Sequence, residues 1–119
     1  MRPILLGVLL CAIPALAVDL TGRWWGDAVS DNGSQPVYLI VIQEGSSLKG
    51  TGGPDPKNQS LLTNGKIQGS RVSFDVIPGN SAPLHFELTL DDAGLKGTVR
   101  VRRNGQFVTS KVSLRKRTT

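Results

Sequence analysis

The sequence has 119 residues, of which 14 are lysine or arginine and 9 are aspartate or glutamate, so its formal net charge at neutral pH is +5. A single cysteine excludes an intramolecular disulfide, and a single histidine excludes a zinc site built on two histidines. The length suits one domain with a modest core.

The N-terminal segment has the pattern of a secretory signal peptide, predicted to span residues 1–17. Arg2 supplies a positive charge, residues 4–13 form an apolar run too short to span a bilayer, and a small-x-small sequence ends at Ala17. Cleavage near Ala17 would leave residues 18–119 as a single exported domain. We therefore expect a secreted or periplasmic protein with no transmembrane span and no nucleic-acid partner.

After residue 18, short alternating runs of apolar and polar residues are separated by turn residues, which is the pattern of β-strands. No stretch has the period of a helix. The sequence predicts about eight short strands, near residues 24–29, 37–42, 48–52, 65–68, 71–76, 84–90, 95–103 and 106–115.

The clearest hairpin is the last one, because Asn104-Gly105 favours a two-residue turn between its strands. This turn sets Arg102 opposite Phe107. The alternation of apolar and polar residues along the two strands of this hairpin predicts an apolar core face and a polar outer face. The predicted core residues of the last four strands are Val72, Phe74, Val76, Leu84, Phe86, Leu88, Leu90, Val99, Val101, Val108, Val112 and Leu114.

A four-residue motif occurs twice, 47 positions apart, as Leu-Lys-Gly-Thr at residues 48–51 and 95–98. At the same offset Gly22 matches Gly69, Val29 matches Val76, Ser34 matches Ser81, Pro36 matches Pro83 and Gln59 matches Gln106. These matches predict a duplicated four-strand unit, with halves near residues 20–66 and 67–115.

Two such units can bury their apolar faces only against each other. The sequence therefore predicts an all-β fold, an antiparallel up-and-down barrel of about eight strands, with a two-sheet β-sandwich as the alternative. Because the strands are short and aromatic residues are few, we expect side chains to fill the interior.

Gly22-Arg23-Trp24, at the start of the first strand, resembles the Gly-x-Trp signature of calycin-like barrels, the lipocalin-like and avidin-like proteins. The chain also resembles small secreted bacterial barrel domains of uncertain function. The resemblance implies the barrel fold and a Trp24 side chain inside the barrel. The internal repeat instead aligns Trp25 with the core residue Val72, so which tryptophan lies in the core stays open.

The sequence offers little for catalysis. His85 lies on an alternating strand and is expected to face solvent, and no nucleophile motif accompanies it. Asp55, Asp91 and Asp92 are expected to form turns and not to bind a metal. We therefore predict no enzyme activity, no catalytic residue, no metal site and no cofactor.

The connections at one end of the barrel favour a binding site there. The sequence predicts long loops at residues 30–36, 53–60 and 77–83, and binding residues concentrate on loops held by a rigid scaffold. We expect an exported binding or accessory module whose ligand is an unknown small molecule or envelope component. The candidate ligand-binding residues are Asp31, Asn32, Lys57, Asn58, Asn80 and Arg103.

An alternative function is the binding of a polyanion, an acidic glycan or an anionic envelope polymer, because residues 95–117 contain eight basic residues and no acidic one. The residues expected on the polyanion face are Lys96, Arg100, Arg102, Lys111 and Arg115.

A third expectation concerns self-association. Tyr38, Ile40 and Ile42 alternate with the core residues of their strand and would form an exposed apolar row. Such a row predicts a homodimer, unless a register shift turns it inward.

Overall fold

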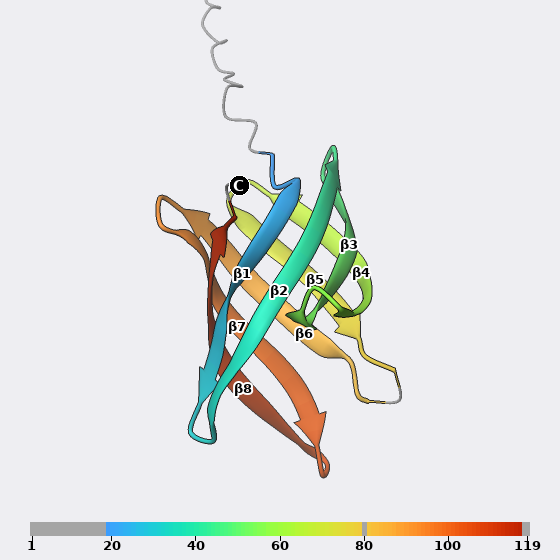
Figure 1. Ribbon diagram of the computed structural model, residues 1–119, viewed down its shortest axis with the longest axis vertical. Helices are drawn as coiled ribbons and strands as arrows, with labels where there is room; N and C mark the ends of the chain where they lie inside the picture. The colour runs from blue at the N-terminus through green and yellow to red at the C-terminus, as the bar shows by residue number, and fades with distance from the viewer. Residues whose placement is uncertain (1–18, 80, 118–119) are drawn as a thin grey trace, which may run out of the picture.

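In the computed structural model, the described residues, 19–79 and 81–117, form one closed antiparallel barrel of eight strands (Figure 1). The strands are β1 (Gly22–Ser30), β2 (Gly33–Glu44), β3 (Ser47–Asp55), β4 (Asn58–Gln68), β5 (Arg71–Ile77), β6 (Leu84–Asp91), β7 (Gly94–Arg103) and β8 (Gln106–Lys116). Each strand pairs with the next and β8 pairs with β1, so the predicted up-and-down barrel is confirmed over the sandwich. The predicted signal peptide and Asn80 lie outside the described residues.

The predicted register of the last hairpin is confirmed. Arg102 lies opposite Phe107, and Asn104 and Gly105 have φ angles of 52° and 79°, as a two-residue turn between twisted strands requires. Alternation along β5 to β8 then turns the predicted core residues inward. Among the described residues, the largest fully buried side chains are Phe74, Leu20, Leu39, Leu95, Leu114 and Val72.

One end of the barrel is closed by Leu20 and Trp24, which lie near the start of the described residues. The Trp24 side chain is 4% exposed, and its Nε1 donates a hydrogen bond to the Leu20 carbonyl (2.9 Å). Leu20 itself is buried, and its backbone N–H donates to Gln43 Oε1 (2.8 Å). Trp25 faces outward and is 55% exposed. The core tryptophan is therefore Trp24, as the Gly-x-Trp resemblance implied.

The two Leu-Lys-Gly-Thr copies occupy matching places in β3 and β7. Leu48 and Leu95 are both buried in the core. A Cβ on Gly50 would lie 1.9 Å from the Ile40 carbonyl oxygen, and a Cβ on Gly97 would lie 2.0 Å from the Glu87 carbonyl oxygen. Each motif thus combines a core leucine with a glycine that lets the preceding strand approach closely. The duplication itself stays a prediction.

The matching does not extend to every position of the repeat. Val29 on β1 is 50% exposed, whereas its partner at the same offset, Val76 on β5, is 2% exposed. Trp25 likewise faces outward where Val72 faces inward. The alternation of β1 is therefore shifted by one residue relative to that of β5.

Two of the three loops predicted to be long are tight turns, so that expectation is wrong. β1 and β2 are joined by residues 31–32, and β3 and β4 by residues 56–57, whereas only the β5–β6 connection, residues 78–83, is longer. The polar and glycine-rich residues on either side of these turns pair as strands, because each backbone finds its hydrogen-bonding partner in the neighbouring strand.

The predicted apolar row on β2 is only partly exposed. Ile42 is 50% exposed and Ile40 is half-buried, but Tyr38 is 5% exposed, so its expected exposure is wrong. Arg23 Nη1 donates to the Tyr38 hydroxyl (3.2 Å), and Trp25 is the cross-strand neighbour of Tyr38 on β1. These long neighbouring side chains shield an outward-facing ring. The predicted homodimer stays a prediction.

The close approach at the repeated motif predicts that Gly97→Ala destabilises the barrel. The added Cβ would meet the backbone oxygen of Glu87, which cannot move without distorting β6. We expect a loss of more than about 1 kcal/mol in the free energy of unfolding. Urea denaturation measures it, with Thr98→Ala, an exposed neighbour on the same strand, as the control. Equal stabilities of the two variants would contradict this reading of the motif.

Candidate functional site

The barrel holds a cavity of about 260 Å³ at the end opposite Trp24. Its inner wall is apolar and its rim is formed by prolines and by the ends of the strands. The lining residues are Ala28, Gln35, Pro36, Val37, Leu39, Gly52, Gly53, Pro54, Ser60, Val76, Pro78, Leu84, Phe86, Val99, Val101, Arg103 and Ser110. The expectation that side chains fill the interior is therefore wrong for this half of the barrel.

The cavity exists because small residues occupy inward positions near its mouth. Ala28 on β1 and Gly52 on β3 both face the interior and both line the cavity. A Cβ on Gly52 would lie 2.9 Å from Leu39 Cδ2 and 3.1 Å from Val76 Cγ2, so Leu39 and Val76 already occupy the space beside this glycine. A larger side chain in place of Ala28 would fill part of the cavity.

Four polar side chains accompany the apolar wall. Gln35, Ser60 and Ser110 belong to the lining from β2, β4 and β8. Arg103, at the end of β7, is the only charged residue in the part of the lining that the structure describes. An apolar wall with a few polar groups is the usual composition of a small-molecule site. The arrangement can hold an apolar group inside and an acidic group at the rim.

Of the predicted ligand-binding residues that the structure describes, only Arg103 lines the cavity. Asp31 and Asn32 form the exposed β1–β2 turn. Lys57 lies in the β3–β4 turn, where its backbone N–H donates to Asp55 Oδ1 (2.8 Å). Whether these residues bind a ligand stays a prediction.

Asn58 has a structural contact that accounts for its side chain. Its Nδ2 donates to both carboxylate oxygens of Asp55, at 3.0 and 2.9 Å. These side-chain hydrogen bonds, together with the backbone N–H of Lys57, lower the pKa of Asp55 below its ordinary value. Asn58 thus fixes the β3–β4 turn at the rim of the barrel.

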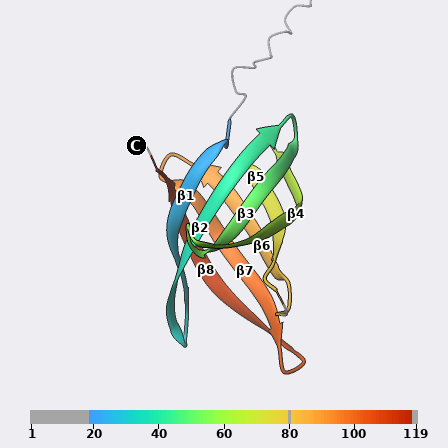
Figure 2. The same cartoon turned by 45° about the vertical axis from the view of Figure 1, so that its right-hand side comes forward.

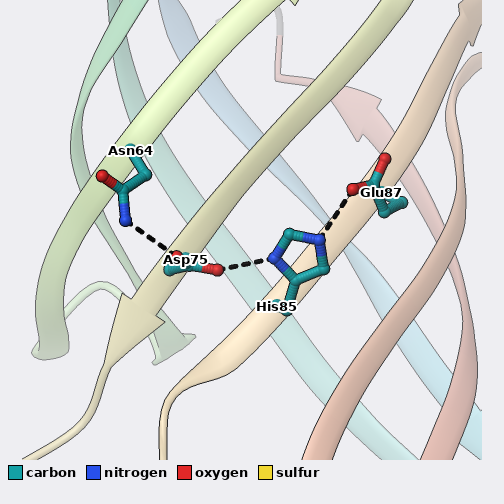
Figure 3. A network of polar contacts seen from close by, with 4 residues as sticks. All are labelled: Asn64, Asp75, His85 and Glu87. Carbon is teal, nitrogen blue, oxygen red and sulfur yellow. Dashed lines mark hydrogen bonds and ion pairs between the residues drawn. The ribbon is translucent and has the colours of Figure 1, made fainter.

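A second polar arrangement lies on the outer face of β4, β5 and β6. Figure 3 shows Asn64, Asp75, His85 and Glu87 in a row across these strands. His85 Nδ1 lies 2.6 Å from Asp75 Oδ1, and His85 Nε2 lies 2.7 Å from Glu87 Oε2. Asn64, at an irregularity in β4 where its φ is 55°, donates from Nδ2 to Asp75 Oδ2 (3.0 Å).

The network favours a charged His85. The hydrogen bond to Asp75 raises the pKa of His85, and this effect, with the contact to Glu87, outweighs the opposing effect of burial. Burial raises the pKa of Asp75, but the hydrogen bonds from Asn64 and His85 outweigh it, so that pKa is lowered. The imidazole therefore bridges the carboxylates of Asp75 and Glu87 and connects β5 to β6.

This arrangement gives His85 a role in holding the sheet together. Both ring nitrogens contact carboxylates, and no hydroxyl group among the described residues contacts the ring. Within residues 19–79 and 81–117, no three histidine, cysteine or acidic side chains gather as a metal site would require. The same part of the chain contains no helix that is long and apolar enough to cross a membrane.

The predicted polyanion face lies on the outside of β7 and β8, where Lys96, Arg100, Arg102, Lys111 and Arg115 are all exposed. Two of these residues share an aromatic neighbour: the guanidinium carbons of Arg100 and Arg102 lie 4.8 and 4.9 Å from the centroid of Phe107. The face is thus basic and partly apolar.

Comparison with known proteins gives no identification, because the chain matches no protein-family model, no curated protein and no solved structure at a significant level. The function must therefore be inferred from the barrel and its surface.

The His85 network predicts a pH-dependent contribution to stability. Because the pKa of His85 is raised in the folded protein, its stabilisation is fully present below its ordinary value of 6.5 and is lost as pH rises through the folded value. The pKa of Asp75 is lowered in the folded protein, so its stabilisation is fully present above the ordinary value of 3.8. That stabilisation is lost as pH falls through the folded value. The network therefore stabilises most between these two ordinary values.

We expect His85→Gln to lower the free energy of unfolding by about 1 kcal/mol at most in this pH window, since solvent screens a pair that is 36% exposed at the histidine. The difference from the unsubstituted protein should shrink at alkaline pH. Urea denaturation across pH measures it. Lys49→Gln, which removes the exposed ion pair with Glu44 (3.1 Å), is the matched control with no measurable loss. A pH-independent effect of His85→Gln would refute the assignment.

Proposed function

We propose that this protein is an exported, non-enzymatic binding module that holds a small, mainly apolar ligand with an acidic group in the open end of the barrel. The observation that carries the proposal is the cavity opposite Trp24, with Arg103 as the only charged side chain among the described residues that line it. A medium-chain fatty acid has this chemistry, since its tail is apolar and its carboxylate suits a guanidinium.

The size and lining of the cavity support a small ligand. Its volume of about 260 Å³ lies just below the ordinary range of ligand pockets, roughly 300–1,000 Å³. Leu39, Phe86 and Val99 form an apolar floor that would bury the tail. Gln35, Ser60 and Ser110 supply hydrogen-bonding groups that can fix the ligand's orientation.

The closed base and open mouth also support a calycin-like character. The Gly22-x-Trp24 sequence places a buried tryptophan at one end of an eight-stranded barrel, as the resemblance to calycin-like barrels implies. A barrel closed at one end can hold a ligand that enters from the other end. Export, the calycin relationship and the ligand class are parts of one proposal.

Titration calorimetry with hexanoate, octanoate and decanoate tests the proposal. Ala28→Leu should weaken binding of all three acids by about tenfold or more, because the larger side chain occupies part of the cavity. Arg103→Gln should weaken the binding of octanoate by about tenfold but leave the binding of octanol unchanged, because only the acid has a charge that interacts with Arg103.

Lys57→Gln is the matched control, because Lys57 is an exposed rim cation that does not line the cavity. It should bind all three acids like the unsubstituted protein. The proposal fails if no acid binds, or if Ala28→Leu binds the acids unchanged. An equal loss of affinity in Lys57→Gln and Arg103→Gln would indicate a general attraction of the acids to the basic rim and not a specific contact with Arg103.

A further inference from the structure

The open end of the barrel carries an exposed patch that is both basic and apolar. We call it the hairpin patch and define it as Val29, Arg100, Arg102, Phe107 and Lys111. Val29 lies opposite Lys111 across β1 and β8, and Arg102 lies opposite Phe107 across β7 and β8. Phe107 is 58% exposed and Val29 is 50% exposed, so two large apolar side chains face water among three cations.

The arginines of the hairpin patch are held by the aromatic ring. Arg100 and Arg102 both stack on Phe107, which restrains their guanidinium groups while their N–H donors stay accessible. Among the described residues, neither arginine nor Lys111 forms a salt bridge. The patch therefore presents three cations that are not neutralised by this part of the chain.

The His85 network accounts for this lack of pairing at Arg100. His85 is the cross-strand neighbour of Arg100 on β6, and the two nearby carboxylates, Asp75 and Glu87, are both bound to the imidazole. Arg100 instead contacts Phe107 on β8. The positive charge of the patch is therefore available to a partner.

The position of the patch suits contact with an extended surface. Figures 1 and 2 both show the β1–β2 and β7–β8 hairpins reaching furthest at the lower end of the barrel, beyond the β3–β4 turn. Phe107 is the second residue of β8 after the β7–β8 turn, and Val29 is the last residue but one of β1 before the β1–β2 turn. The apolar members of the patch are therefore carried on the projecting part of the molecule.

We propose that the hairpin patch docks on an anionic lipid surface, with the Phe107 ring in the interface and Arg100, Arg102 and Lys111 at the lipid phosphates. Cations of this kind are attracted to an anionic leaflet, and an aromatic side chain gains from transfer into its interfacial region. A hydrated soluble polymer would use the cations but leave Phe107 and Val29 in water. The mixed character of the patch thus favours lipid over polymer.

Flotation with vesicles of phosphatidylcholine and phosphatidylglycerol tests the docking. The protein should bind the mixed vesicles and not vesicles of phosphatidylcholine alone. Phe107→Ser should weaken binding by about tenfold or more, and Phe107→Leu should keep most of it, because the apolar transfer is retained. Arg102→Gln should weaken binding by about fivefold, as expected for one cation near an anionic surface.

Trp25→Ser is the matched control. Trp25 is equally exposed and also lies opposite an arginine, Arg115, but nearer the closed end of the barrel, so its loss should not weaken vesicle binding. All variants keep the same N-terminal segment, and the comparison therefore reports on the substituted residue alone. Equal losses in Trp25→Ser and Phe107→Ser would overturn the proposal.

Fluorescence provides a second readout. Phe107→Trp, made in a Trp25→Phe background, should show a blue-shifted emission on mixed vesicles, because the new indole enters the interface. Vesicle binding by Phe107→Ser equal to that of the unsubstituted protein would overturn the proposal. So would retention on heparin without vesicle binding, which would assign the patch to a soluble polyanion. Ala28→Leu should still bind vesicles, so this test is independent of the cavity's ligand.

Discussion

Closure of the sheet between β1 and β8 is the constraint on which the other features depend. Once the last strand pairs with the first, every strand has one face toward a shared interior and one toward solvent, and no edge is left to pair elsewhere. The interior then has a size fixed by the number of strands and their tilt. Side chains can fill this space or leave part of it empty, but the barrel cannot collapse around a gap as a loosely packed core can.

The two ends of the barrel use this fixed interior differently. At one end Leu20 and Trp24 add bulk from the segment that enters β1, and the indole hydrogen bond to Leu20 ties that segment across the opening. At the other end the small side chain of Ala28 leaves space, and Arg103 lies at the rim. The cavity at the open end follows from where the chain places large and small residues on inward positions.

The sequence predicts the strands, their inward faces and the register of the last hairpin, because these depend on local alternation and on the Asn104-Gly105 turn. It fails where neighbouring strands decide the outcome. The residues around the first two turns of the open end look like loops but pair as strands, and Tyr38 is shielded by Arg23 from the neighbouring strand. The cavity has a weak local signal in the polar or small residues at inward positions, such as Ala28 and Ser110. Recognising it requires the closed barrel, since no single strand shows which inward positions meet.

The outer surface shows the same dependence on neighbours. His85 draws Asp75 and Glu87 to itself, although Arg100 lies beside it in the sheet and would be an equally suitable partner by charge. Since the imidazole contacts both carboxylates, Arg100 contacts Phe107 instead. One network on β5 and β6 thus separates the surface into a neutralised region and a basic region. The basic region coincides with the projecting hairpin because β7 and β8 contribute basic side chains and the described residues of that hairpin contain no acidic one.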